Sequence, residues 1–226
     1  MTELAHESTD YSVVEREPPE VLQRNLYVAA RLWASSTAFF FFAFLFAYFY
    51  LRSLDNHGLW RPKHVDPSQT LGVLTTLAVV VTAVLLRWAL VNRRADNRRA
   101  WRQKGAVSIA LIVLAIVLQI VEWSTQGFGP TDGAYASVYV GWTGMEALFL
   151  VGLLYWLETT LATSLRYRKV YPAKFAAGEA AGDSHREAPD IRDPLSLVPA
   201  TLEAVSFYAL FLGGIFIVSW IVLYLL

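Results

Sequence analysis

The sequence predicts an all-α membrane protein of five transmembrane helices, with its N-terminus in the cytoplasm and its C-terminus outside. Of the 226 residues, 55% are hydrophobic and only 17% are charged, whereas a typical soluble domain has about 25% charged residues. Five apolar stretches are each long enough to cross a bilayer, which takes roughly 20 residues. They lack the alternation of apolar and polar residues that is typical of outer-membrane barrels. Because backbone groups in hydrocarbon must bond within their own segment, these stretches are expected to be helices.

The predicted helices follow one another along most of the chain. They cover about residues 26–51, 71–91, 106–125, 135–163 and 202–226. Residues 1–25 are polar and acidic, without the basic start and apolar core of a signal peptide, and they are expected to form a cytoplasmic tail. The transmembrane domain then spans residues 26–226. Within it, residues 166–199 are rich in Ala, Gly and charge, and they predict a flexible cytoplasmic loop rather than a separate domain.

Positive charge is concentrated in two of the four connections. These basic residues are Arg93, Arg94, Arg98, Arg99, Arg102 and Lys104 in one connection, and Arg166, Arg168, Lys169, Lys174, Arg186 and Arg192 in the other. The connection QGFGPTDGA, between the third and fourth helices, has no Lys or Arg. The positive-inside rule places the two basic loops in the cytoplasm, which fixes the orientation. The basic residues then serve topology and contact with lipid headgroups, and no nucleic-acid partner is expected.

Composition also limits the chemistry of this chain. It has no cysteine, which excludes disulfides, thiolate zinc sites and iron–sulfur clusters held by this chain alone. The four histidines, His6, His57, His64 and His185, all fall outside the predicted helices, so none is placed to ligate a haem within the bilayer. No glycine-rich phosphate loop is present. We therefore expect no catalytic residue, metal or cofactor in this chain.

Ionisable residues inside a membrane are costly, so they are the first candidates for a functional role. Glu122 lies near the outer end of the third helix, with Gln119 three residues earlier on the same face and Trp123 beside it. One interpretation is an interfacial cap beneath a belt of aromatic residues. The other is a hydrogen bond that joins this helix to a neighbour.

Glu146 lies deeper, near the middle of the fourth predicted helix. Small residues surround it, namely Ser137, Gly141, Gly144, Ala147 and Gly152. Small residues let helices approach closely, and a polar group at such a seam can bond across it. Desolvation favours a protonated carboxyl there, acting as a structural hydrogen-bond donor. The alternatives are a site of proton exchange or ion binding, and a contact with lipid headgroups or a water-filled cavity.

Four stretches together resemble subunit III of haem–copper (cytochrome c) oxidases. They are SSTAFFFFAFLFAYFYLRS with the following GLWRP, LQIVEWSTQ, GAYASVYVGWTGMEALFLVGLLYW and AVSFYALFLGGIFIVSWIVLYLL. The resemblance extends over all five predicted helices and leaves out the N-terminal tail and the 170–199 loop. Gln119, Glu122 and Trp123 are similar to the family's Gln-x-x-Glu-aromatic helix end. Thr37 stands where the family usually has a buried glutamate, and Glu146 and Phe149 stand where it has two histidines, so the chain resembles a divergent member of the five-helix form.

The resemblance implies an accessory subunit without redox centres in a bacterial cytoplasmic (inner) membrane. Such a subunit packs on subunit I, in a complex with subunit II, and supports assembly, turnover stability and proton-coupled oxygen reduction. Haem and copper would belong to these partners, and phospholipid would be a further ligand. Three alternatives are an accessory subunit of a nitric oxide reductase or quinol oxidase, a stand-alone transporter that uses Glu146 and Glu122, and a structural or lipid-binding protein. Because Glu146 replaces a family histidine, it is expected to preserve a polar joint between helices.

Overall fold

The computed structural model describes residues 19–55, 60–95, 97–170 and 197–226, and for 19–20 and 166–170 only the backbone. In this part of the chain the regular elements are helices: α1 (Pro19–Ser53), α2 (Gln69–Arg94), α3 (Arg98–Thr125), α4 (Ala134–Val170) and α6 (Val198–Trp220), which continues as the π-helical turn η2 (Ile221–Leu225). All five long helices have the length and apolar composition needed to cross a membrane. The prediction of an all-helical fold with five membrane spans is therefore confirmed.

The helices are longer than their apolar stretches, which corrects several predicted boundaries. Residues 19–25, predicted as part of a polar tail, are helical in α1. The basic stretch from Arg98, predicted as a loop, forms the first turns of α3, and Asn97 caps it by accepting a hydrogen bond from the Ala100 amide (3.1 Å). Hydropathy marks only the apolar part of a helix, whereas Arg and Lys are good helix formers outside the hydrocarbon.

The predicted loop 166–199 is also shortened at both ends. Residues 166–170 continue α4, and residues 197–199 belong to the first turn that leads into α6. The remaining residues of this predicted loop, 171–196, lie outside the described part of the chain, as do residues 1–18 of the predicted tail.

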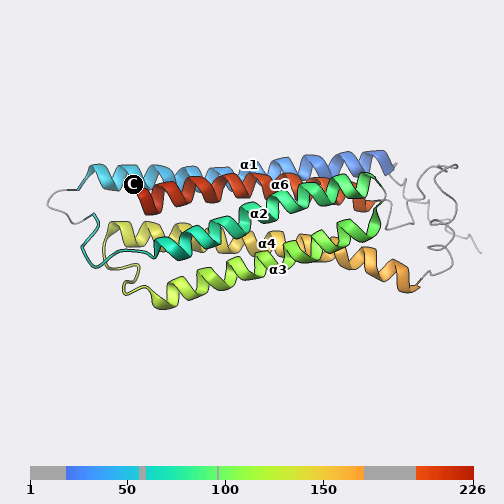
Figure 1. The fold of residues 1–226 in the computed structure, drawn as a ribbon. Helices are drawn as coiled ribbons and strands as arrows, with labels where there is room; N and C mark the ends of the chain where they lie inside the picture. Colours follow the sequence, from blue (N-terminus) through green and yellow to red (C-terminus); the bar gives the residue numbers. More distant parts are fainter. Residues whose placement is uncertain (1–18, 56–59, 96, 171–196) are drawn as a thin grey trace, which may run out of the picture.

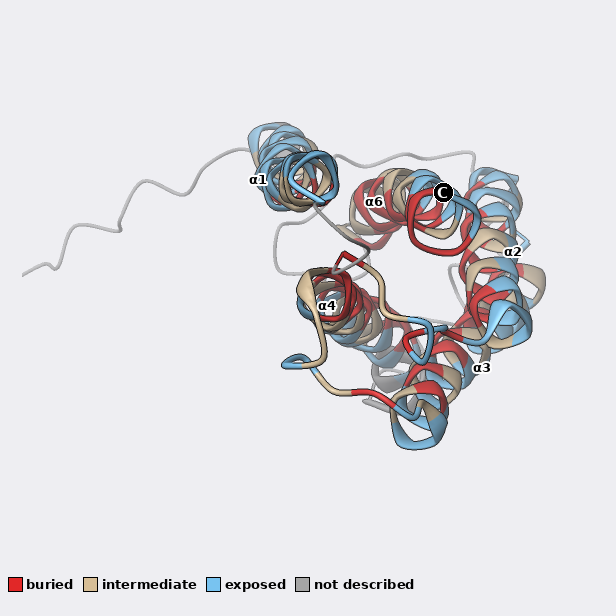
Figure 2. Ribbon diagram, turned by 90° about the vertical axis from the view of Figure 1, so that its left-hand side faces the viewer, coloured by how far each residue is buried: buried red, intermediate tan, exposed pale blue. Residues whose placement is uncertain are grey.

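The helices form an elongated bundle in which successive helices run in opposite directions (Figure 1). One end, which we call the basic end, holds the start of α1, Arg94, Arg98 and the start of α6; we call the other the far end. Seen along the bundle, α1 packs on α6 and α4, α6 also packs on α2, and α3 lies between α2 and α4 (Figure 2). The buried faces of the helices point toward the interior, and α1 is the most exposed of the five.

The interior combines apolar packing with aromatic rings and small residues. Fully buried side chains include Leu86, Ile112, Leu157 and Leu212, which come from four different helices. Helices α2 and α6 approach closely at a glycine, Gly213, where an added Cβ would lie 3.5 Å from the Cβ of Ala83. Because lipid tails are as apolar as these side chains, such packing and the hydrogen bonds between helices hold the bundle together.

Candidate functional site

Glu122 is the centre of a buried polar cluster at the far end of the bundle. Its side chain is 1% exposed. The hydroxyl of Tyr224 donates to both carboxylate oxygens, at 2.9 and 3.0 Å. The hydroxyl of Tyr139 lies 3.0 Å from that of Tyr224, and since Tyr224 uses its proton on Glu122, Tyr139 is the donor between the two rings. The cluster therefore joins α3, α4 and η2, with Glu122 inside the bundle.

The π-helical turn η2 positions Tyr224 for this role. A π-helix is rare and commonly occurs at functional positions. Here the turn is held from two sides: Gln69 donates its side-chain amide to the backbone carbonyl of Tyr224 (3.2 Å), and the Tyr135 hydroxyl donates to the carbonyl of Leu223. The ring of Tyr224 rests against Gly72 of α2, where any Cβ would come within 2.5 Å of the ring. A side chain at position 72 is therefore incompatible with this ring position.

The two residues predicted beside Glu122 make different contacts. Gln119 is buried and its amide nitrogen lies 3.5 Å from Glu122 Oε2, a weak hydrogen bond. The indole nitrogen of Trp123 points instead to α4, where it donates to Thr143 Oγ1 (3.0 Å). Trp123 thus forms a second polar link between α3 and α4.

Glu146 belongs to a separate contact between α4 and α6. The indole nitrogen of Trp142 donates to the hydroxyl oxygen of Ser219 (2.7 Å), and the Glu146 carboxyl group lies beside this pair. Glu146 is only 4% exposed, and its Oε1 has no hydrogen-bond partner within the described residues. The structure therefore places Glu146 inside the bundle, away from lipid headgroups.

Thr37 lies apart from both carboxylates, in the contact between α1 and α6. Its hydroxyl donates to the carbonyl of Trp33 (2.8 Å), one turn earlier. The hydroxyl of Tyr208 lies 3.1 Å from the same oxygen, and because Thr37 has already donated its proton, Tyr208 is the donor. The five predicted residues thus fall into four polar contacts, of which only the one around Glu122, which includes Gln119, contains more than one of them.

Comparison with known proteins decides which family this arrangement represents. Residues 11–178, more than half of the chain, match the family described as cytochrome c oxidase subunit III. The chain belongs to the cytochrome c oxidase subunit III family. The matched residues include helices α1 to α4 and end before α6, so the resemblance of the last helix to this family stays a prediction. Family membership and the five spans together make the chain a multi-pass membrane protein.

Individual relatives carry the name cytochrome c oxidase subunit 3. The protein from Tachyglossus aculeatus aculeatus is 30% identical over 154 residues, which is 66% of this chain and 59% of the relative. Those from Oryctolagus cuniculus and Hippopotamus amphibius are 30% and 31% identical over 137 residues, 58% of this chain and 52% of each relative. The chain therefore aligns with little more than half the length of the curated subunit III proteins it matches.

Several residues of these polar contacts were not predicted from the sequence, and tyrosines are the largest group among the residues missed. Tyr135, Tyr139, Trp142 and Glu146 follow one another at intervals of four, three and four residues. This spacing puts them on one face of a helix, and it was a usable signal on α4. The partners on α6 and η2 had no such signal, because their apolar residues surround the helix evenly.

The described parts of this subunit III chain, 19–55, 60–95, 97–170 and 197–226, contain no group of three or more His, Asp or Glu side chains that could hold a metal ion. His64 lies in the connection between α1 and α2, and His6, His57 and His185 lie outside the described residues.

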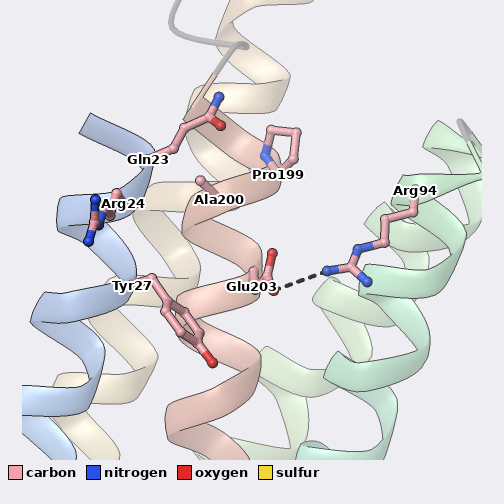
Figure 3. A pocket seen from close by; sticks show the side chains of 7 residues that line it. All are labelled: Gln23, Arg24, Tyr27, Arg94, Pro199, Ala200 and Glu203. Carbon is pink, nitrogen blue, oxygen red and sulfur yellow. Dashed lines mark ion pairs between the residues drawn. The ribbon is translucent and has the colours of Figure 1, made fainter. Parts of the chain in front are cut away.

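At the basic end, a groove of about 350 Å³ opens between α1, α2 and α6. Figure 3 shows Arg94 of α2 reaching across to Glu203 of α6, with a nitrogen–oxygen distance of 3.0 Å. Gln23, Arg24 and Tyr27 of α1 line the opposite side. The two ion-paired side chains are 56% and 43% exposed, so the pair contributes little stability, about 0–1 kcal/mol.

One prediction concerns Glu146. Glu146→Gln keeps the shape and one acceptor oxygen, so we expect the thermal midpoint in detergent to change little. Glu146→Leu removes the acceptor beside the Ser219 hydroxyl, whose oxygen already accepts from Trp142. Leaving this buried donor unpaired costs about 1–3 kcal/mol, so the variant is expected to unfold at a clearly lower temperature. Equal losses in the two variants would show that the hydrogen bonds of Glu146 do not matter for packing.

Proposed function

We propose that this chain is an accessory subunit, without a redox centre of its own, of a cytochrome c oxidase-type haem–copper complex. It would pack on subunit I in a complex that also contains subunit II, and support assembly, turnover stability and proton-coupled oxygen reduction. The observation that carries this proposal is the match of residues 11–178 to the subunit III family. Haem and copper would be held by the partner subunits, and phospholipid would be a further ligand.

In this role, Glu122, Gln119, Trp123, Thr37 and Glu146 are structural. They hold α1, α3 and α4 to the last helix and α3 to α4, so that the bundle presents a fixed outer surface to its partners. The contacts support this role because their hydrogen bonds run between helices. Tyr224 donates to Glu122, Trp123 donates to Thr143, and Tyr208 donates to Thr37. Glu146→Gln is accordingly expected to leave the oxygen reduction rate of the complex within about twofold of wild type, because only an essential proton carrier would cost more.

The test is to purify the tagged full chain from its native membrane in mild detergent and to record reduced-minus-oxidised visible spectra. We expect haem bands, together with catalytic subunits identified by mass spectrometry and oxygen consumption that requires them. A colourless preparation without partner subunits would overturn the proposal, and transport assays on Glu146 and Glu122 variants would then follow. Haem bands with nitric oxide reduction in place of oxygen reduction would assign the chain to a nitric oxide reductase instead.

We also propose that the chain lies in a bacterial inner membrane with its basic end in the cytoplasm. The support is the concentration of Arg and Lys around Arg94 and Arg98 at that end. In this orientation the groove beside Arg24 and Arg94 faces anionic lipid headgroups.

The orientation can be tested directly because the native chain has no cysteine. Thr131→Cys, at the far end, is expected to react with a membrane-impermeant maleimide on intact cells with a permeable outer layer. Arg99→Cys, at the basic end, is expected to react only after the membrane is opened. The reverse pattern would show that the chain is inserted the other way round.

A further inference from the structure

Helix α1 carries a row of large side chains that no other part of the described chain covers. Phe39, Phe42 and Phe46 are 77%, 66% and 71% exposed, and Leu32 and Phe49 extend the row toward the two ends of the helix. Less of α1 is buried than of any other span, and it packs mainly on α6 and α4. Figure 2 shows α1 at the edge of the bundle, with much of its surface exposed. We call these five side chains the α1 row.

The spacing of the α1 row is that of a helix-packing seam. Leu32, Phe39 and Phe46 are seven residues apart, and Phe42 and Phe49 follow the last two at an interval of three. Large residues that repeat as positions a and d of a heptad keep one stripe facing a second helix. Two exposed positions between them, Ser36 and Ala43, are small, while Trp33 and Phe40 add large exposed side chains beside the row. A partner helix can therefore lie along the row at the crossing angle of about +20° that is common in membrane bundles.

The composition of the row distinguishes it from the surfaces of α2 and α3. The exposed apolar residues in the middle of those two helices are aliphatic: Leu74, Leu77, Val81 and Val84 on α2, and Val113, Leu114, Val117 and Ile120 on α3. Such side chains match lipid tails. The aromatic belts at the membrane surfaces consist of Trp and Tyr, whereas the α1 row consists mainly of phenylalanines. Phe39 and Phe42 lie in the middle third of the 35-residue helix, and Phe46 lies about one turn further on. Aromatic residues are enriched in the interfaces between proteins.

We propose that the α1 row is the docking surface for one transmembrane helix of another membrane subunit, whose facing side carries small residues. This inference rests on the proposed function, since it requires a partner in the membrane. Covering these rings would bury on the order of 500 Å² of this chain's surface, a large part of the roughly 800 Å² that each partner contributes to a standard interface.

A second copy of this chain is a poorer occupant. Two copies in one membrane would be related by a two-fold axis along the membrane normal, which brings each row against itself. Phe39 would then meet Phe39 and Phe46 would meet Phe46, so that large rings face each other where close helix pairs place small residues. A helix with Gly, Ala or Ser opposite the rings fits this surface better.

The test places a photo-crosslinking phenylalanine analogue at Phe42 in the full chain, expressed in its native membrane. Leu77 on α2 and Val117 on α3, which are 55% and 48% exposed, receive the same analogue as controls. Illumination is expected to join position 42 to one defined membrane subunit and to leave both controls without this adduct. Adducts with lipid alone, with a second copy of this chain, or equally from all three positions would overturn the inference.

A second measurement uses truncation. The double variant Phe39→Ala with Phe46→Ala is expected to lower the haem recovered per tagged chain about tenfold, because rings buried at an interface commonly contribute more than 1.4 kcal/mol to binding. The matched pair Leu77→Ala with Val117→Ala is expected to keep wild-type recovery. Equal losses from both pairs, or no loss from the first, would contradict the assignment. If the wild-type chain itself brings no haem, the proposed function has failed rather than this surface.

Discussion

Glu122→Leu is expected to lower the free energy of unfolding by about 2–4 kcal/mol, the largest effect of any single substitution considered for this chain. The carboxylate accepts the Tyr224 hydroxyl on both of its oxygens, and the Tyr139 hydroxyl lies 3.0 Å from that of Tyr224. Leucine offers no acceptor, so the Tyr224 hydroxyl and the Gln119 amide lose their partner in a buried place. Each unpaired buried group costs about 1–3 kcal/mol. The measurement is the thermal unfolding midpoint of the purified chain in mild detergent.

Glu122→Gln is the control, because it retains one acceptor oxygen in the same position. We expect it to keep most of the stability that the leucine variant loses. Replacing both tyrosines as well, with Tyr139→Phe and Tyr224→Phe, should remove much of the cost of Glu122→Leu, because no hydroxyl is then left unpaired. If Glu122→Leu destabilised the chain just as much when both tyrosines are phenylalanine, the hydrogen bonds of the cluster would not be the reason for the loss of stability.

Gly72→Ala is expected to destabilise the chain by about 1–3 kcal/mol, the usual cost of overpacking a filled interior. An added Cβ would lie 2.5 and 2.6 Å from two atoms of the Tyr224 ring. The ring must move to relieve this contact, but its hydroxyl is held by Glu122 and its backbone carbonyl by Gln69. The substitution therefore acts on the polar cluster from a different helix, and loss of thermal stability in detergent measures it.

The chain offers matched controls for Gly72→Ala. A Cβ at Gly152 of α4 or Gly214 of α6 would meet nothing within 4 Å, so alanine at either position is expected to be neutral or slightly stabilising, since it is the better helix former. In a Tyr224→Ala background Gly72→Ala should also cost little, because the ring that it displaces is absent. A similar cost at all three glycines would point to a general helix effect rather than to contact with Tyr224.

The sequence predicted how many helices cross the membrane and roughly where they lie. It did not predict where each helix ends or which side chains of other helices it contacts. All five spans follow from apolar length, whereas the helical turns at 98–105 and 166–170 were predicted as loop because hydropathy does not register polar helix. Gln119 and Glu122 were predicted to share a face and do so, because a spacing of three residues is a local property. The bond from Tyr224 joins residues 102 positions apart, and no local pattern in the last helix indicates it.

The sequence by itself determined that this protein is a five-helix membrane protein, because the cost of unpaired backbone groups in hydrocarbon leaves a long apolar segment no other regular structure. It also carried the family resemblance that the match over residues 11–178 confirmed. Only the tertiary structure decided that Glu122 and Glu146 serve two different contacts, one with Tyr139 and Tyr224, the other with Trp142 and Ser219. Which side chains meet depends on how the helices are rotated about their axes. In a chain that is apolar on nearly every face, the packing of the helices and the hydrogen bonds between them set that rotation.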